Sequence, residues 1–301
     1  MSWAIPKRYL KLTIYQGADK KKVISVLDDR AKISFDTSES VSGAMNECNC
    51  SISGLTKEKM LYLSTSTSAW VNERIRNRIV IEAGYDNNRN IVFDGIISDA
   101  NPDLSNPDFL IQMKAISAYD IMTDMVKSYS FGGAVPASEI ARAIAKDAGL
   151  GFENGLEEDV IINNYNYTNN SIISHLRYLS SIPKTPLDIW ITNNVVKIKN
   201  RGKPFKSTTA KIPLISYKTN MIGSPQPNDM GCVVKVRMSS QWRSGQEVSL
   251  ESIRFKALNS TNYVIQTFHH SGNTRGANWH TNLTLIRKDI YMGGSKSYVQ
   301  T

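Results

Sequence analysis

Apolar and polar residues alternate along most of this chain, and a period of two predicts short, half-buried antiparallel strands. The clearest case is residues 231–238, where Cys232 and Val234 point to one side and Lys235 and Arg237 to the other. Similar alternation fills the first and the last third of the chain. These two parts are therefore predicted to be antiparallel β-structure.

Turn residues precede the strand at 231–238, and a loop containing Trp242 and Gly245 follows it and leads to a second short strand at 248–250. Glycine and proline in such a cluster set the backbone conformations that tight turns need. None of these side chains is equipped for catalysis, so the stretch predicts a barrel corner and a role in assembly. The turn residues are Gly223, Pro225, Pro227, Asn228, Asp229 and Gly231.

A hairpin is predicted at residues 78–98, where two alternating stretches, RIVIEAGY and IVFDGIIS, flank the polar turn 86–90. Ile79 and Ile81 share one face of the first strand, and Phe93 and Gly95 lie on the matching face of the return strand. The residues of interest in this hairpin are Gly84, Tyr85, Asp94 and Gly95.

The middle of the chain has a helical period instead. Residues 136–150 carry an apolar stripe that begins after a proline and ends at a glycine, and residues 168–181 predict a second helix capped among 168–170. A hairpin follows at 187–199, where Asn193 and Asn194 favour a type I′ turn. This pattern predicts a small α+β insertion.

The predicted fold is therefore mainly β with an α+β insertion, containing two antiparallel tube-like β-barrels. The expected domains are a first barrel at 1–118, the insertion at 119–204, and a second barrel with a C-terminal tail at 205–301. We expect the two barrels to superimpose although their sequences are unrelated.

The AGY…FDG hairpin and the IGSPQP–D–G stretch resemble the baseplate hub proteins of contractile phage tails. These comprise the late-control hub family and the related hub part of type VI secretion spike proteins. The resemblance runs through most of the chain in the order of its elements. It implies a structural protein of the virion, placed in the tail baseplate and assembled in the host cytoplasm.

The same resemblance implies a homotrimer whose barrels form a ring with pseudo-sixfold symmetry, adapting a sixfold tail tube to a threefold spike. The implied partners are a tube or tube-initiator protein above, a spike protein below, surrounding wedge proteins and, as a further candidate, a tape-measure protein. DNA is met only in passage. Since the chain ends soon after the second barrel, the spike is expected to be a separate protein. In this interpretation Trp242 and Trp279 are expected to be either interface anchors or core residues.

Composition leaves little room for other chemistry. The 301 residues carry a formal charge of +9, contain no apolar run as long as a membrane span, and begin without the apolar core of a signal peptide. No catalytic motif or paired metal-ligand spacing is present. Of the histidines, His175, His269, His270 and His280, only His269 and His280 could approach each other, across the last hairpin, and Cys232 is the one candidate for the third ligand that a metal would need. Loop or surface histidines are the default interpretation. We therefore expect no enzyme activity, cofactor or metal, and expect Cys48, Cys50 and Cys232 to be buried thiols.

Two alternatives stay open at this point. A barrel that binds single-stranded nucleic acid would use exposed tryptophans as stacking platforms, and the candidates are Trp70, Trp190, Trp242 and Trp279. A tail-associated peptidoglycan hydrolase would lose its activity on substitution of His280.

Overall fold

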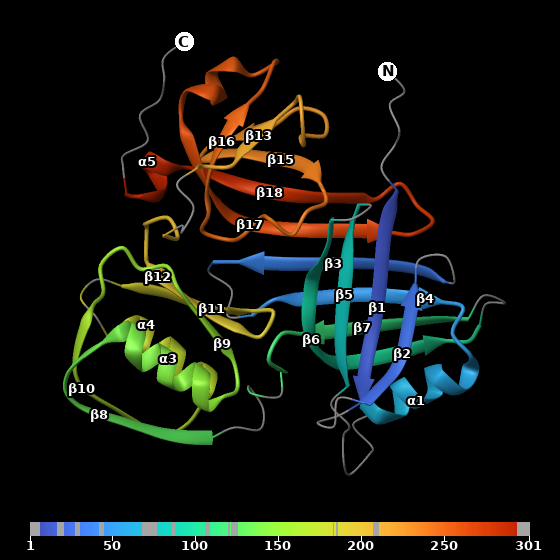
Figure 1. The fold of residues 1–301 in the computed structure, drawn as a ribbon, viewed down its shortest axis with the longest axis horizontal. Coiled ribbons are helices and arrows are strands. Elements are labelled where there is room, and N and C mark those ends of the chain that lie inside the picture. The colour runs from blue at the N-terminus through green and yellow to red at the C-terminus, as the bar shows by residue number, and fades with distance from the viewer. Residues whose placement is uncertain are drawn as a thin grey trace.

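The structure is a computed structural model that describes residues 7–16, 21–27, 31–41, 45–67, 77–85, 88–105, 109–119, 121, 126–182, 184, 186–206 and 211–293. Within these ranges no helix has both the length and the apolar character needed to cross a bilayer. Figure 1 shows β-strands in the first and last parts of the chain and two helices packed together in the middle part.

The first segment of the chain is an antiparallel sheet with one helix, α1, against it. Met60 and Leu63 of α1 are fully buried in the core that the strands form, which is why this weakly amphipathic stretch is helical at all. The elements are β1 (Arg8–Gln16), β2 (Lys21–Leu27), β3 (Lys32–Ser40), β4 (Glu47–Ser53), α1 (Lys57–Thr67), β5 (Arg78–Tyr85), β6 (Asn88–Asp103) and β7 (Leu110–Ile116).

The last segment is also β-structure, built around the long antiparallel pair β17 and β18. Its core contains the inward residues of the predicted alternation, among them Cys232, Val234 and Leu283. The elements are β13 (Leu214–Ser216), β14 (Gln226–Asn228), β15 (Gly231–Arg237), β16 (Glu247–Glu251), η1 (Lys256–Ser260), β17 (Asn262–Asn273), β18 (Trp279–Arg287) and α5 (Lys288–Tyr291).

One sheet runs through both segments, because β17 pairs with β3 in an antiparallel register from Thr267 opposite Ser40 to Asn273 opposite Ser34. The strand order is β14-β15-β18-β17-β3-β4-β7-β6-β5-β1-β2, with β16 also paired to β17 and β13 paired to β16. Figure 1 shows β17 and β3 side by side where the two segments meet. The shared sheet covers two hydrophobic cores, and the first of them also includes Met238 and Trp279 of the last segment.

The predicted mainly β, antiparallel class with an α+β insertion is confirmed. Among the described residues, however, the pairing path runs from β14 to β2 and its ends do not pair, so no hydrogen-bonded barrel closes. The domain boundaries 1–118, 119–204 and 205–301, and the superposition of the two segments, stay predictions.

The insertion packs two helices between a two-stranded ribbon and a three-stranded sheet. Ile140, Ile144 and Leu176 are among the residues that form its core. Gly149 adopts a φ of +70° directly after the first helix and its C-cap, as the predicted capping glycine should. The elements are β8 (Val126–Pro136), α3 (Ala137–Asp147), β9 (Gly151–Asn154), β10 (Ile161–Ser171), α4 (Ile172–Ser181), β11 (Leu187–Thr192) and β12 (Val195–Asn200).

Two features of the insertion differ from the sequence prediction. Helix α4 begins at Ile172 after Ser171, whose hydroxyl accepts a hydrogen bond from the Ser174 amide, rather than being capped among 168–170. Those earlier residues instead extend β10, which pairs with β8. The ribbon was missed because its strand period is interrupted by left-handed residues at Asn164 and Asn169, where the register shifts.

Candidate assembly site

Asp94 lies in the AGY…FDG hairpin, the first signature of the hub family, and is a buried residue that holds this hairpin in place. The Asp94 side chain is 7% exposed, and its carboxylate accepts two hydrogen bonds from the Arg78 guanidinium on β5, at 2.7 and 2.5 Å. The backbone amide of Asp94 donates to Asn193 Oδ1 at 3.0 Å, and its carbonyl accepts from the Ser117 hydroxyl. The residue therefore ties the hairpin to the turn of the insertion.

The glycine next to Asp94 is needed for close packing. A Cβ added to Gly95 would lie 2.7 Å from the carbonyl oxygen of Ile116 on β7, a contact that real side chains do not make. Gly84 lies in β5 between β1 and β6, and beside it Tyr85 packs edge-on against Trp279, with 6.5 Å between the ring centres. The hairpin thus touches the last segment as well as the insertion.

The IGSPQP–D–G stretch, the second signature of the hub family, forms a tight hairpin between β14 and β15. Asn228 Oδ1 accepts hydrogen bonds from the amides of Met230 and Gly231, which fixes the turn that contains Asp229. A Cβ on Gly231 would lie 2.2 Å from the carbonyl oxygen of Leu285 on β18, so only glycine fits.

The two prolines of this signature flank Gln226 of the short strand β14. Pro225 is buried, and Pro227 lies in β14 opposite Cys232. Gly223 before them has a φ of +77° and open space around it, so there glycine serves the backbone conformation. A short edge strand with proline resists pairing with stray chains, and β14 is one end of the large sheet.

The two predicted anchor tryptophans are core residues in the single chain. Trp242 is 2% exposed and Trp279 is 3% exposed. Gly245, with a φ of +81°, fixes the loop after Trp242: its amide donates to the carbonyl of Ile265, and its carbonyl accepts from the Phe205 amide, both at 2.7 Å. A role of these residues as interface anchors stays a prediction.

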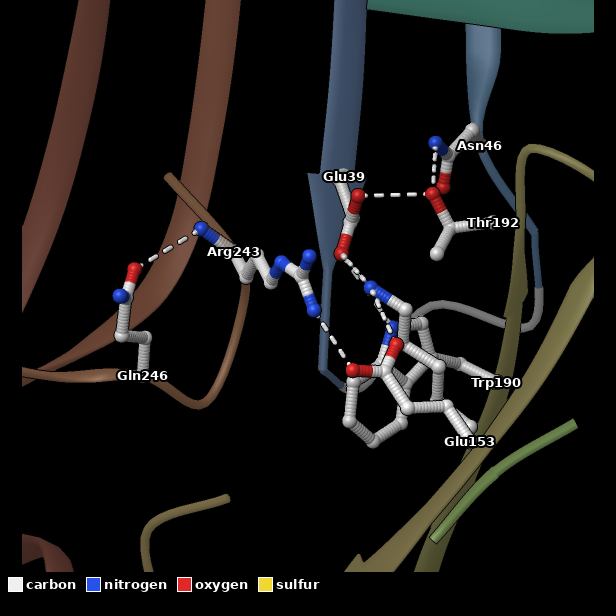
Figure 2. A network of polar contacts seen from close by, with 8 residues as sticks. Glu39, Asn46, Glu153, Trp190, Thr192, Arg243 and Gln246 are labelled. Carbon is white, nitrogen blue, oxygen red and sulfur yellow. Dashed lines mark hydrogen bonds and ion pairs between the residues drawn. The ribbon is translucent and has the colours of Figure 1, made fainter. Parts of the chain in front are cut away.

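Sequence reasoning missed a polar junction at which all three segments meet (Figure 2). We call it the three-segment junction. The carboxylate of Glu39 on β3 accepts hydrogen bonds from Thr192 Oγ1 at 2.7 Å and from Trp190 Nε1 at 3.4 Å. Its members are Glu39 and Asn46 of the first segment, Glu153, Trp190, Thr192 and Lys197 of the insertion, and Arg243 and Gln246 of the last segment.

The junction continues through alternating charges into the last segment. Lys197 Nζ lies 4.0 Å from a Glu39 oxygen and 3.7 Å from a Glu153 oxygen. Glu153 also accepts from Arg243 at 2.6 Å, and the Arg243 amide donates to Gln246 Oε1. One signal in the sequence could have found it, because Glu39 occupies an inward position of the β3 alternation.

A cleft of about 480 Å³ opens beside the junction, lined among others by Arg89, Lys197, Arg243 and His270. Burial lowers the pKa of His270 to about 4, and its Nδ1 lies 2.8 Å from Thr281 Oγ1. Most of these charged groups are engaged in contacts with other residues of the chain. The arrangement is suited to holding the segments together.

The residues considered for metal binding do not converge. Register places His280 opposite Ser271, and His269 opposite Asn282. Across the described ranges no group of three or more His, Cys, Asp or Glu side chains could hold a metal ion. Cys48, Cys50 and Cys232 are free, buried thiols, as expected. Burial raises the pKa of Cys48, and that of Cys232 to about 12.

Solved structures with this fold come from phage tails and from a secretion system. A 43 kDa tail protein of prophage MuSo2 from Shewanella oneidensis aligns with a TM-score of 0.59 at 11% identity, covering 93% of this chain and 98% of that one. A tail protein from Neisseria meningitidis MC58 aligns with a TM-score of 0.58 at 9% identity, covering 94% of this chain and 98% of that one. The E. coli c3393 protein, a type VI secretion component, aligns with a TM-score of 0.57 at 12% identity, covering 89% of this chain and 76% of that one.

A search of curated proteins finds no match to the chain. At such low identities the structural likenesses establish the fold alone. The family model described as baseplate hub gp41, in contrast, matches residues 10–284. Because this match spans most of the chain, the protein belongs to the baseplate hub gp41 family and has a structural role in a phage tail.

Proposed function

We propose that this protein is the central hub of the baseplate, and that three copies form a ring joining a sixfold tail tube to a threefold spike. DNA passes through the ring, and the chain catalyses no reaction. The observation that carries the proposal is the single sheet that continues from one β-segment into the other through β3 and β17.

One side of this shared sheet suits a channel wall. From β15 to β6 the outward positions are mostly polar or charged, and Ser34, Asn49 and Gln112 lie along a shallow hollow of about 510 Å³ on β3, β4 and β7. The opposite positions, such as Phe35 and Met113, face the core. A polar face of this breadth, on the sheet that the two β-segments share, supports contact with water and a passing polymer.

Charges on this face balance, although the whole chain carries +9. Binding to DNA strengthens with each phosphate neutralised by lysine or arginine. A balanced wall lets DNA slide, whereas a strongly positive wall would hold it. The cations are Lys32, Lys114, Lys235 and Arg237, and the anions are Asp36, Glu47, Asp99 and Asp103.

The unlike ends of the sheet support a ring. A cyclic assembly needs a heterologous interface, with a different patch on each side of the subunit. The sheet ends in β14 on one side and in β2 on the other, so the two sides of the subunit are unlike. Three chains with two β-segments each present six such segments, the number that a sixfold tube requires.

The decisive experiment is electron cryo-microscopy of assembled tails. We expect three copies on the axis, between tube and spike, with the β3–β4–β7 face toward the lumen. Six copies, or a position at the baseplate periphery, would rule out this role.

A charge test separates the channel wall from the rest of the surface. Asn49→Arg with Gln112→Arg should leave tail assembly unchanged and slow DNA ejection severalfold, because the wall then attracts phosphate. The matched control is Asn163→Arg with Asn166→Arg on exposed positions of β10. Equal ejection rates in the two variants would contradict the assignment of the wall.

The alternative of a single-stranded nucleic-acid-binding protein finds no support at its expected residues. Stacking needs an exposed ring face, but Trp190, Trp242 and Trp279 are at most 3% exposed. Trp70, the fourth candidate, lies outside the described residues.

A further inference from the structure

A clamped loop, residues 252–259, projects between β16 and β17. At its base the Ser252 amide donates to Asn259 Oδ1 at 2.8 Å, while Asn259 Nδ2 donates to the Ser252 carbonyl at 3.0 Å. The Tyr263 hydroxyl donates to the carbonyl of Leu258, and the Leu258 amide donates to that of Phe255. The loop is therefore closed at its base and held from within.

This clamped loop exposes two large apolar side chains next to two cations. Ile253 is 59% exposed and Phe255 is 41% exposed. Arg254, which lies between them in the sequence, and Lys256, which follows Phe255, are exposed as well. Large apolar side chains on a pre-ordered loop lose little conformational entropy on binding, which favours their use as contact anchors.

The charge of the surrounding segment indicates the sign of the partner. Residues 205–301 contain twelve lysines and arginines against four acidic residues, so this segment holds +8 of the chain's +9. Neighbouring Lys218 and Lys288 are paired with Glu251 and Glu247. Arg254 and Lys256 have no ion pair among the described residues, so they remain available to an external carboxylate.

We propose that the loop 252–259 docks another protein of the assembly, one whose surface offers an apolar pocket rimmed by aspartate or glutamate. Ile253 and Phe255 enter the pocket, and Arg254 and Lys256 meet the rim. A nucleic acid is the poorer fit, because an aliphatic Ile253 cannot stack on bases and two cations neutralise only two phosphates. This inference goes beyond the proposed hub role, since it names a surface and the chemistry of its partner.

The test places the photo-cross-linker p-benzoylphenylalanine at position 255 of the full chain within assembled tails. After irradiation, mass spectrometry should find the cross-link in a different tail protein, on a peptide flanked by acidic residues. A cross-link to DNA, to another copy of this chain or to a peptide without carboxylates would overturn the proposal, as would the absence of any cross-link.

A charge-reversal pair supplies the second arm. Arg254→Glu with Lys256→Glu should lower the cross-link yield about tenfold, because both cations would then repel the acidic rim. The control is Lys57→Glu with Lys59→Glu on exposed positions of α1, which should leave the yield unchanged. Equal yields in the two variants would contradict the role of the cations.

The same preparation keeps this inference apart from the hub proposal. Tails that lack the chain altogether refute the hub role. Tails that contain the chain at the axis, but with position 255 uncross-linked, refute only the docking loop.

Discussion

Replacing Glu39 by alanine should weaken the attachment of the insertion to the first segment more than any surface change of similar chemistry. The Glu39 carboxylate is 5% exposed and accepts hydrogen bonds from Thr192 and Trp190. Its removal leaves the Trp190 indole N–H buried without that acceptor. It also takes away one of the two carboxylates near Lys197, whose side chain is 9% exposed.

The expected loss of stability depends on the burial of Glu39 and on the carboxylate that remains near Lys197 after the substitution. Breaking a buried charge pair by removing one partner costs about 3–5 kcal/mol. Glu153, 3.7 Å from Lys197, stays in place and offsets part of this loss. We therefore expect Glu39→Ala to lower the free energy of unfolding by about 3 kcal/mol. Glu39→Gln keeps an oxygen for Thr192 and should cost about half as much.

The measurement is urea unfolding at pH 7, followed by circular dichroism and by tryptophan fluorescence. The control is Glu47→Ala on the neighbouring strand, since Glu47 pairs with Lys114 while both side chains are nearly half exposed. That variant should lose at most about 1 kcal/mol. If Glu39→Ala cost no more than this control, the three-segment junction would not hold the segments together. A double-mutant cycle with Lys197→Met isolates the pair itself.

Three further outcomes are expected. Gly231→Ala should lower the free energy of unfolding by several kcal/mol in urea titrations, because the added Cβ would lie 2.2 Å from a backbone oxygen. Gly223 has open space around it but a φ of +77°, so Gly223→Ala should lower the free energy of unfolding by only about 1 kcal/mol. Equal losses in the two variants would refute the steric argument. Burial lowers the pKa of His270 to about 4, so protons bind the unfolded chain first and stability should fall as pH drops from about 6.5 toward 4. In His270→Gln that slope should be shallower, and an unchanged slope in pH-dependent urea titrations would contradict the assignment. Native protein should resist alkylation by iodoacetamide and react fully in guanidinium, whereas rapid native labelling would show open thiols. The thiols concerned are Cys48, Cys50 and Cys232.

Local chemistry made much of the fold readable from the sequence. Alternation assigned the buried face of β15 correctly, because successive side chains of a strand point to opposite sides. Asn193 and Asn194 adopt φ values of 47° and 61°, the left-handed pair that a type I′ turn requires. The same local signals carried the resemblance to the hub family, because the two signatures are turn and strand patterns.

The sequence was less informative where local signals conflict with each other. The β8–β10 ribbon went unpredicted because two left-handed asparagines break its alternation. Helix α4 begins later than expected because β10, paired with β8, extends to Ser171.

By itself, then, the sequence determined most strands of the first and last segments, the type I′ turn at Asn193 and Asn194, the existence of both helices of the insertion, and the buried side of strands such as β15. Only the tertiary structure decided that β3 pairs with β17, and that Glu39 meets Thr192 and Trp190. The physical reason is that the backbone N–H and C=O groups along the edge of a strand can pair with any other strand. Which distant strand it joins depends on the burial and polar satisfaction of the whole chain, and no local window of residues contains that information.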